Sequence, residues 1–152
     1  MKKGFTLIEL LIVIGILAVL GTYVAQTGQI DSAPLAAAIP VACLISTLLF
    51  INEFPDYEAD RATGKRTLVV SLGPEKARYY VAALAGTAYL SIVSSVLAGL
   101  LPLGSLLAVL PAILIVKAID SLFINYNRGP NLIPAIKSVI LAHFCTGIIL
   151  AV

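Results

Sequence analysis

Five apolar runs, each long enough to cross a bilayer as a helix, constrain this chain more than any other feature of its sequence. They extend over residues 5–25, 33–51, 77–101, 104–124 and 133–152. A helix needs about 20 apolar residues to cross the hydrocarbon core. Backbone groups cannot stay unpaired in lipid, and the runs lack the alternation of a β-barrel, so we expect them to be helical. The sequence therefore predicts an all-α fold, a polytopic membrane bundle of about five transmembrane helices.

The composition agrees with a membrane protein and excludes several other classes. The chain of 152 residues is 60% hydrophobic and 12% charged, whereas soluble domains average about 25% charged residues. The net charge of +2 is small and no basic patch is interleaved with aromatic residues, so we expect no nucleic-acid partner. Cys43 and Cys145 lie inside apolar runs and form no C-x-x-C pair, which indicates small core residues. His143 lies within the last run, and we expect it to be buried and hydrogen-bonded in the packing.

Three prolines predict where the apolar helices kink or end. Pro40 and Pro111 lie inside runs, and we expect each to kink its helix because proline lacks an N–H and clashes with the preceding turn. Pro55 follows the second run, so that helix should bend or end near Phe54. One long polar loop, roughly residues 52–76, then separates the second run from the third.

The distribution of charge predicts an orientation. One set of loops holds a cluster of cations, Arg61, Lys65, Arg66, Lys76, Arg78 and Arg128, and lies on the same side as Lys2 and Lys3. The loops on the other side hold Asp31 and no lysine or arginine. The positive-inside rule then places the N-terminus and the aspartate-rich loop in the cytoplasm and the C-terminus outside, in the cell (inner) membrane. Lys117 and Lys137 should lie near the cytoplasmic ends of their helices, within snorkelling reach of the interface.

The first 20 residues form a segment of their own. Gly4, Phe5 and Glu9 follow a short basic leader, and this segment resembles the N-terminus of type IV prepilins. The resemblance implies cleavage after Gly4. A pilin would continue into a polar soluble domain, whereas this chain returns to apolar runs. The simpler interpretation is an ordinary spanning helix over residues 5–25, anchored by the N-terminal lysines.

The polar stretch from Asn52 to Thr67 holds the residues that suggest chemistry. Asp56 and Asp60 are four residues apart, which on a helix puts both carboxylates on one face, with Asn52 one turn earlier in the same row. Paired carboxylates suit Mg²⁺, which also takes phosphate oxygens and water. Lys65 and Arg66 supply donors for a phosphate. Spacing alone leaves a second interpretation open, in which this is a solvated loop whose cations meet anionic lipid headgroups.

The same stretch, N-E-F-P-D-Y-E-A-D-R-A-T-G-K-R-T, resembles the second aspartate-rich motif of the UbiA family of intramembrane prenyltransferases, in the quinone-pathway form. Shorter similarities occur at residues 21–28 and 131–137. The resemblance implies that residues 21–152 form the C-terminal half of such an enzyme, which transfers a prenyl group from an allylic prenyl diphosphate to an aromatic acceptor. It also implies that Mg²⁺ is the cofactor, with Asp56 and Asp60 as catalytic metal ligands. Asn52, Lys65 and Arg66 would then bind substrate.

The sequence departs from that family pattern in one respect. Family members carry a first aspartate-rich motif, of the N-D-x-x-D-x-x-x-D kind, and the only acids in residues 1–31 are Glu9 and Asp31. The resemblance therefore implies an incomplete site, to be completed by an N-terminal half or a homo-oligomer. The alternative from another class is a pilin-like or structural membrane protein without catalysis.

Overall fold

All regular structure in the described part of the chain is helical. The computed structural model describes the backbone of residues 7–151, and the side chains of residue 10 and of residues 12–151. Its elements are α1 (Leu7–Thr27), α2 (Ser32–Asn52), α3 (Tyr57–Ala62), α4 (Leu68–Leu72), α5 (Pro74–Leu97), the 3₁₀ helix η1 (Leu103–Val109), α6 (Ala112–Asn125), the 3₁₀ helix η2 (Gly129–Leu132) and α7 (Ile133–Ala151). Gly4 and Phe5 of the prepilin-like segment lie outside the described residues, as does the side chain of Glu9.

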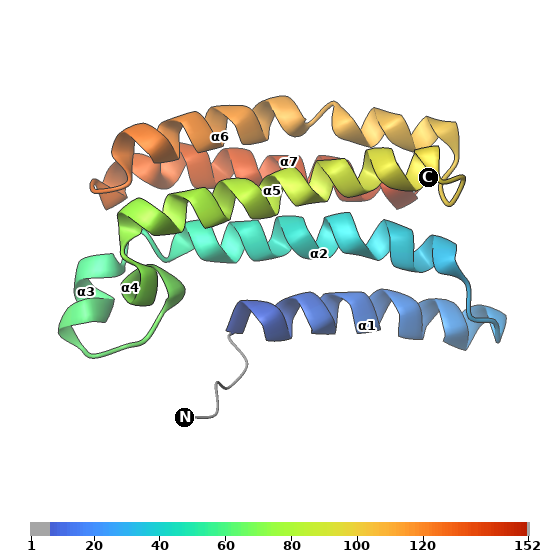
Figure 1. Cartoon of the computed structure of the whole chain (residues 1–152), viewed down its shortest axis with the longest axis horizontal. Coiled ribbons are helices and arrows are strands. Elements are labelled where there is room, and N and C mark those ends of the chain that lie inside the picture. The colour runs from blue at the N-terminus through green and yellow to red at the C-terminus, as the bar shows by residue number, and fades with distance from the viewer. Residues whose placement is uncertain (1–6, 152) are drawn as a thin grey trace.

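The long helices run back and forth, side by side (Figure 1). Four segments are long and apolar enough to cross a membrane, Ser32–Asn52, Pro74–Leu97, Leu103–Asn125 and Gly129–Ala151, and a shorter apolar stretch, Ile12–Thr27, lies within α1. The predicted all-α polytopic membrane bundle is therefore confirmed. The connections that follow α2 and α6 lie together at one end of the bundle, which we call the charged end.

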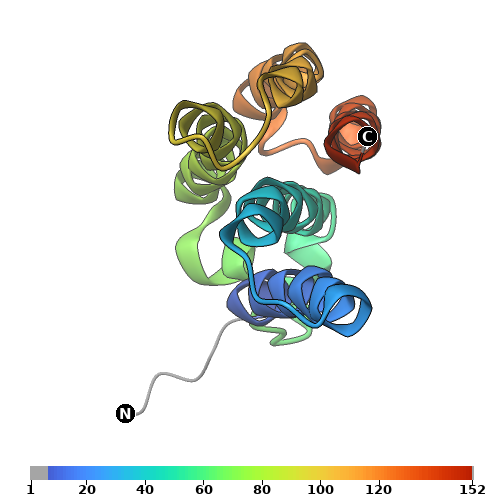
Figure 2. The ribbon, with the colours of Figure 1, turned by 90° about the vertical axis from the view of Figure 1, so that its right-hand side faces the viewer.

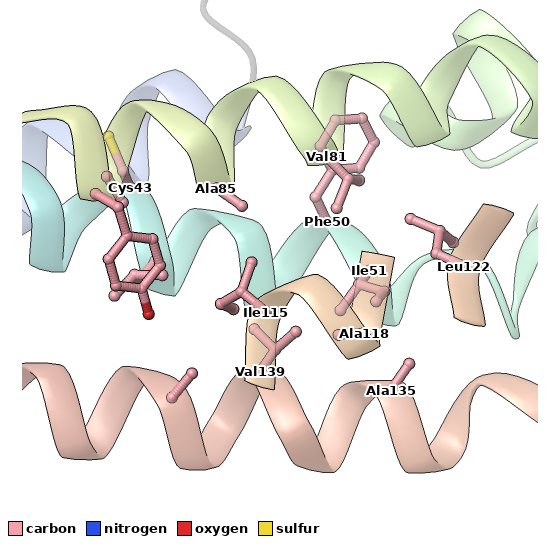
Figure 3. Close-up of a cluster of buried hydrophobic side chains, with 14 of the residues drawn as sticks. Cys43, Phe50, Ile51, Val81, Ala85, Ile115, Ala118, Leu122, Ala135 and Val139 are labelled. Carbon is pink, nitrogen blue, oxygen red and sulfur yellow. The ribbon is translucent and has the colours of Figure 1, made fainter. Parts of the chain in front are cut away.

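The helix α2 lies at the centre of the arrangement. It packs against α1, α5 and α7, while α6 lies between α5 and α7, so that α1 flanks a group of four helices (Figure 2). Figure 3 shows the core of that group, where Cys43, Val81, Ile115 and Val139 come from four different helices. Many of the fully buried positions are alanines, and small residues let helix backbones approach closely. Cys43 is buried and Cys145 half-buried, and both are free thiols, as expected for packing residues.

Buried hydroxyl groups tie the helices together inside this apolar core. Thr146 on α7 donates to the carbonyl oxygen of Ala108 at 3.4 Å, and its Oγ1 lies 3.3 Å from the hydroxyl of Tyr89 on α5. His143 differs from expectation. Its ring is half-buried against Phe144, with centroids 5.7 Å apart, and its Nδ1 is buried without a hydrogen-bond partner among the described residues. The prediction of a hydrogen-bonded histidine is therefore wrong for this nitrogen, which is enclosed by the packing and has no acceptor or donor within reach among the described residues.

The two internal prolines have different effects. At Pro111 the fourth apolar run divides into η1 and α6, as expected from the missing N–H. At Pro40, however, α2 continues unbroken from Ser32 to Asn52. The third run also begins earlier than its apolar residues suggest, since α5 starts at Pro74, where proline suits the first helical turn. Residues 52–76 are not a simple loop, because they contain α3 and α4.

The connection after α6 lies directly against the connection after α2. A Cβ added to Gly129 would lie 2.6 Å from the Cα of Pro55 and 3.0 Å from its carbonyl oxygen. The nearest atoms of Pro55 belong to its backbone, so a side-chain movement could not relieve the clash. Glycine is therefore required for the close approach of these two connections.

We expect Gly129→Ala to destabilise the protein by about 1–3 kcal/mol, the usual cost of forcing an extra methyl group into a packed contact. Gly104→Ala is the matched control, since Gly104 also lies in a 3₁₀ helix and its added Cβ would meet nothing within 4 Å. Thermal unfolding of both variants in detergent measures the difference. Equal unfolding temperatures for the two variants would mean that the approach of Gly129 to Pro55 is not tight.

Candidate functional site

The polar segment at the charged end is built from two short helices and the turns around them. The helix α2 ends at Asn52, and a turn of four residues containing Pro55 leads into α3. The predicted break near Phe54 is thus confirmed. The idea that Asn52 continues the row of Asp56 and Asp60 is wrong, because Pro55 interrupts the helix and Asn52 belongs to α2.

Asp56 and Asp60 are brought together by α3. The amide N–H of Asp60 donates to the carbonyl oxygen of Asp56 at 2.8 Å, so the two residues lie one helical turn apart. Asp56 occupies the N-cap position, is exposed, and makes no capping hydrogen bond with its side chain. Asp60 is 8% exposed. The two carboxylates therefore share a helix but differ in environment, one open to solvent and one enclosed.

Lys65 folds back onto Asp60. Its Nζ lies 3.0 Å from Oδ1 and 3.2 Å from Oδ2 of that carboxylate. A turn at Thr63 and Gly64 makes this possible, since Gly64 has a φ of +72°, a conformation that favours glycine. The hydrogen bond that Lys65 donates to Asp60 raises the pKa of the lysine above its ordinary value of 10.5, so the lysine is a cation at neutral pH. The enclosed aspartate thus carries its own counter-ion.

Arg66 and Asn52 are both exposed and make no side-chain hydrogen bond or ion pair with the described residues. Arg66 lies beside Lys65 in the segment between α3 and α4, which Thr67 ends by accepting a hydrogen bond from the N–H of Val70 at 3.2 Å. The structure therefore places all five predicted site residues at the charged end. It brings Asp56, Asp60 and Lys65 into one cluster and leaves Arg66 and Asn52 beside it.

Glu53 is a residue whose role the sequence did not reveal. Its Oε2 accepts a hydrogen bond at 3.0 Å from the N–H of Val69, which lies sixteen positions further along the chain. The carboxylate thereby binds the first turn of α4, where helix N–H groups are unpaired. Burial raises the pKa of Glu53 above its ordinary value of 4.5, and the bond from Val69 offsets part of this. A glutamate three residues before Asp56 could have suggested a further ligand, but its bond to Val69 assigns it to holding the loop.

We expect Glu53→Gln to reduce the dependence of stability on pH. Because burial raises the pKa in the folded state, the native protein keeps this proton to a higher pH than the unfolded chain. The contribution of Glu53 is therefore greatest below the ordinary value of 4.5 and is lost as the pH rises through the raised value. Glutamine keeps an acceptor for Val69 and does not titrate. Unfolding temperatures of both proteins between about pH 4 and about pH 7 measure the effect, and a constant difference between them would contradict it.

Arg78 connects α5 to the end of α6 at the charged end through contacts of its guanidinium group. Its guanidinium lies over three aromatic rings, 5.1 Å from Tyr79, 4.9 Å from Phe123 and 4.3 Å from Tyr126. It also donates to the carbonyl oxygen of Phe123 at 3.2 Å, while Glu75 lies 3.9 Å away. These contacts fasten the start of α5 to the end of α6. The run Arg78-Tyr79-Tyr80 could have been noticed in the sequence, but its partners on α6 are 45 residues away.

A hollow of about 310 Å³ opens between the two connections at the charged end. Aromatic rings, prolines and two charged residues line it, among them Phe54, Tyr57, Glu58, Tyr126 and Arg128. No group of three or more histidine, cysteine, aspartate or glutamate side chains suited to hold a metal occurs among the residues the structure describes. Asp56 and Asp60 would therefore need oxygen ligands from water or a bound phosphate to complete a metal's coordination.

The fold and this segment define an integral membrane helix bundle whose charged end carries paired aspartates and adjacent cations. A family model, the UbiA prenyltransferase family, matches residues 3–131. This match covers most of the chain, including α1. The chain belongs to the UbiA prenyltransferase family.

Several named proteins are similar to the chain. It is 36% identical to 1,4-dihydroxy-2-naphthoate octaprenyltransferase of Haemophilus influenzae over 82% of this chain and 40% of that protein. The namesake from Mycobacterium leprae is 31% identical over 92% of this chain and 46% of its own length. Human UbiA prenyltransferase domain-containing protein 1 is 40% identical over 43% of this chain and 19% of that protein. The chain thus spans less than half the length of these relatives, and no solved structure matches it.

Proposed function

We propose that this chain supplies the second aspartate motif of a prenyl-transfer site, at which an allylic prenyl diphosphate alkylates an aromatic quinone precursor. The observation that carries the proposal is the cluster of Asp56, Asp60 and Lys65 with Arg66 beside it, at one end of an apolar bundle in a member of this family. The names of the relatives support a dihydroxynaphthoate as the aromatic acceptor.

The two aspartates fit Mg²⁺ as part of a larger ligand set. Mg²⁺ accepts one or two carboxylates together with phosphate oxygens and water. Asp56 is the N-cap residue of α3, and its side chain makes no capping hydrogen bond, so its carboxylate is available to a metal. When bound, the ion would neutralise negative charge that develops on the departing diphosphate. Asp60 would join Asp56 as a ligand, directly or through water, when Lys65 turns from its carboxylate toward the phosphate. Lys65 has the freedom to do so, since its side chain is 63% exposed.

The remaining residues of the cluster would hold the anion. Arg66 offers a planar pair of donors and Lys65 a single mobile charge, and both suit diphosphate oxygens. Asn52 would add a neutral polar contact from the end of α2. In the reaction the bond from the allylic carbon to the diphosphate breaks, a bond from that carbon to the ring forms, and the ring carbon loses its proton. Cations held in place before the reaction lower the barrier to departure of the leaving group.

The proposal also includes the orientation of the bundle in the membrane and the source of the remaining ligands of the site. The cations around α3 and α4 support a cytoplasmic charged end, with the C-terminus outside and the bundle in the cell membrane. Residues 21–152 would form the prenyltransferase part and residues 1–20 a segment of separate character. With two candidate ligand carboxylates in the cluster, we propose that further acidic residues complete the site from another polypeptide segment or a second chain.

Equilibrium binding of farnesyl diphosphate to the purified chain in detergent tests the function. We expect binding with Mg²⁺, weaker binding with EDTA, and weaker binding of farnesyl monophosphate, which has fewer oxygens to share. Equal binding in all three conditions would exclude a metal-diphosphate site. We further expect little turnover with an aromatic acceptor from the chain alone, so efficient prenylation by the pure chain would overturn the proposed incompleteness.

The second candidate function, a pilin-like or structural membrane protein, is favoured by the residues around Gly4. Mass spectrometry of the chain from cells that contain prepilin peptidase distinguishes the two. Cleavage after Gly4 and incorporation into filaments would favour the pilin-like role, and an intact N-terminus would weaken it.

A further inference from the structure

The hollow of about 310 Å³ at the charged end has no role in the proposed cluster of acids and cations. It lies between the turn that introduces α3 and the connection from α6 to η2, and neither Asp56 nor Asp60 lines it. Its lining combines aromatic residues with one acidic and one basic residue: Phe54, Tyr57, Tyr126, Glu58 and Arg128. The hollow therefore offers three kinds of contact at once, a ring face, an anion and a cation.

The walls of the hollow are held in place by contacts within the chain. Pro55 and Gly129 both belong to its lining, and their backbones approach so closely that an added Cβ on Gly129 would lie 2.6 Å from the Cα of Pro55. The guanidinium of Arg78 lies 4.3 Å from the centroid of the Tyr126 ring. Phe54 is 2% exposed. Since the hollow exists before a ligand arrives, little ordering is required when one binds.

The two charged residues of the lining are open to a ligand. Glu58 and Arg128 are exposed, and neither forms an ion pair within 4.0 Å or a side-chain hydrogen bond with the described residues. Their charges sum to zero. A ligand that satisfies both has an anionic group for Arg128 and a cationic group for Glu58. The aromatic residues favour the same cationic group, because the face of a ring attracts a cation.

The hollow also lies at the level of the lipid headgroups. The spanning segments Ser32–Asn52 and Leu103–Asn125 end two positions before Phe54 and one position before Tyr126. The segment Gly129–Ala151 begins within the lining. Figure 1 shows these connections together at one end of the bundle. The headgroup layer extends about 5–7 Å beyond the hydrocarbon core on each side, which corresponds to a few residues of chain.

We propose that this hollow binds the headgroup of phosphatidylethanolamine from the surrounding membrane. The phosphate accepts hydrogen bonds from the guanidinium of Arg128, and the primary ammonium donates to the carboxylate of Glu58. An anionic headgroup without an amine leaves Glu58 without a cation, and a choline headgroup has no N–H to donate. The volume of about 310 Å³ is at the lower end of the range for small-molecule sites, so it suits a headgroup whose acyl chains stay in the bilayer. The bound lipid connects α3 to the segment after α6, independently of the proposed metal cluster.

Native mass spectrometry of the purified chain in detergent tests this proposal. The probes are phosphatidylethanolamine, phosphatidylcholine and phosphatidylglycerol with identical acyl chains, in equal amounts. We expect the ethanolamine lipid to exceed each of the others about fivefold among the bound species, because it alone makes both charge-assisted contacts. Equal binding of the three lipids would overturn the proposal.

Two soluble competitors test for other occupants of the hollow. Phosphoethanolamine has the same charged groups without acyl chains, and 1-naphthoate is an aromatic acid that could use Arg128 and the rings. We expect neither to displace the lipid when added at the lipid's own concentration. Displacement by phosphoethanolamine would assign the hollow to a soluble zwitterion, displacement by 1-naphthoate would assign it to an aromatic acid, and either result would overturn the proposal.

Two single variants separate the two contacts. Glu58→Gln keeps Arg128, so the ethanolamine lipid should lose its advantage over phosphatidylglycerol while phosphatidylglycerol still binds. Arg128→Gln removes the contact to the phosphate and should lower binding of both lipids about fivefold. Both variants should fold, since neither side chain has a bond within the described structure to lose.

The matched controls are Glu75→Gln and Arg61→Gln, which change exposed residues at the same end that do not line the hollow. We expect both controls to keep the preference for the ethanolamine lipid. General damage to the fold would remove binding of all lipids, so a selective loss of the ethanolamine lipid cannot come from it. A preference that survives Glu58→Gln, or that falls as much in Glu75→Gln, would contradict the proposal.

Discussion

Replacing Asp56 and Asp60 together with alanine should abolish Mg²⁺-dependent binding of farnesyl diphosphate, lowering affinity about 100-fold or more. The two carboxylates lie one turn apart on α3 and are the acids of the proposed cluster. Without them the metal has no protein ligand there, and Lys65 and Arg66 remain as cations that bind a phosphate weakly without the metal. The residual binding should therefore be the same in Mg²⁺ and in EDTA.

The control for this variant removes two other negative charges from the charged end of the bundle. Glu58 and Glu75 are exposed carboxylates on α3 and α5, and their joint replacement with alanine also changes the net charge by two. We expect that control to keep its response to Mg²⁺. Equilibrium binding at a fixed salt concentration measures both proteins. If loss of Asp56 and Asp60 changed binding no more than loss of Glu58 and Glu75 did, the proposed metal site would be wrong.

Arg78→Ala should destabilise the bundle by about 2–4 kcal/mol. The guanidinium side chain is 15% exposed, is stacked among three aromatic rings and donates to the carbonyl oxygen of Phe123. Stacking of a cation on each ring and the bond to the carbonyl contribute separately, and all are lost together. Arg78→Lys should recover only part of the loss, because an ammonium group has no planar face to stack.

Thermal unfolding in detergent measures the effect of Arg78→Ala, with Arg61→Ala as the control. Arg61 is also a basic residue at the charged end, but it is exposed and makes no side-chain bond to the described residues. We expect its loss to change the unfolding temperature little. Similar effects from the two variants would show that the aromatic contacts of Arg78 add nothing to stability.

Much of the fold could be predicted because a bilayer restricts what an apolar run can do. The hydropathy of residues 33–51 and 133–152 was enough to predict helices that nearly coincide with α2 and α7. Local chemistry also predicted the break at Pro111 and the end of α2 before Asp56. In each case the deciding effect acts between neighbouring residues: a missing N–H, or the need to pair backbone groups in lipid.

The sequence was enough to predict which residues form the candidate site, but not how their side chains are arranged. The sequence identified Asp56, Asp60 and Lys65 as candidates, yet it could not reveal that Asp60 is enclosed and paired with Lys65. Nor did it suggest that Glu53 reaches Val69, sixteen residues on. These features depend on how the chain turns at Gly64 and packs afterwards, and helical periodicity carries no information about such contacts.

The close approach of Gly129 to Pro55 has a mechanical consequence for the charged end. Pro55 is held between the backbone of Gly129 and the adjoining Glu53, which is bonded to Val69. The turn that introduces α3 is therefore fastened both to α4 and to η2. The segment from Thr63 to Arg66 is exposed, and its hydrogen bonds run back to the end of α3, where Thr63 donates to Ala59 and Lys65 to Asp60. The acids are thus carried by a part of the molecule that is anchored to other elements, and the cations by an exposed turn that is anchored only through α3.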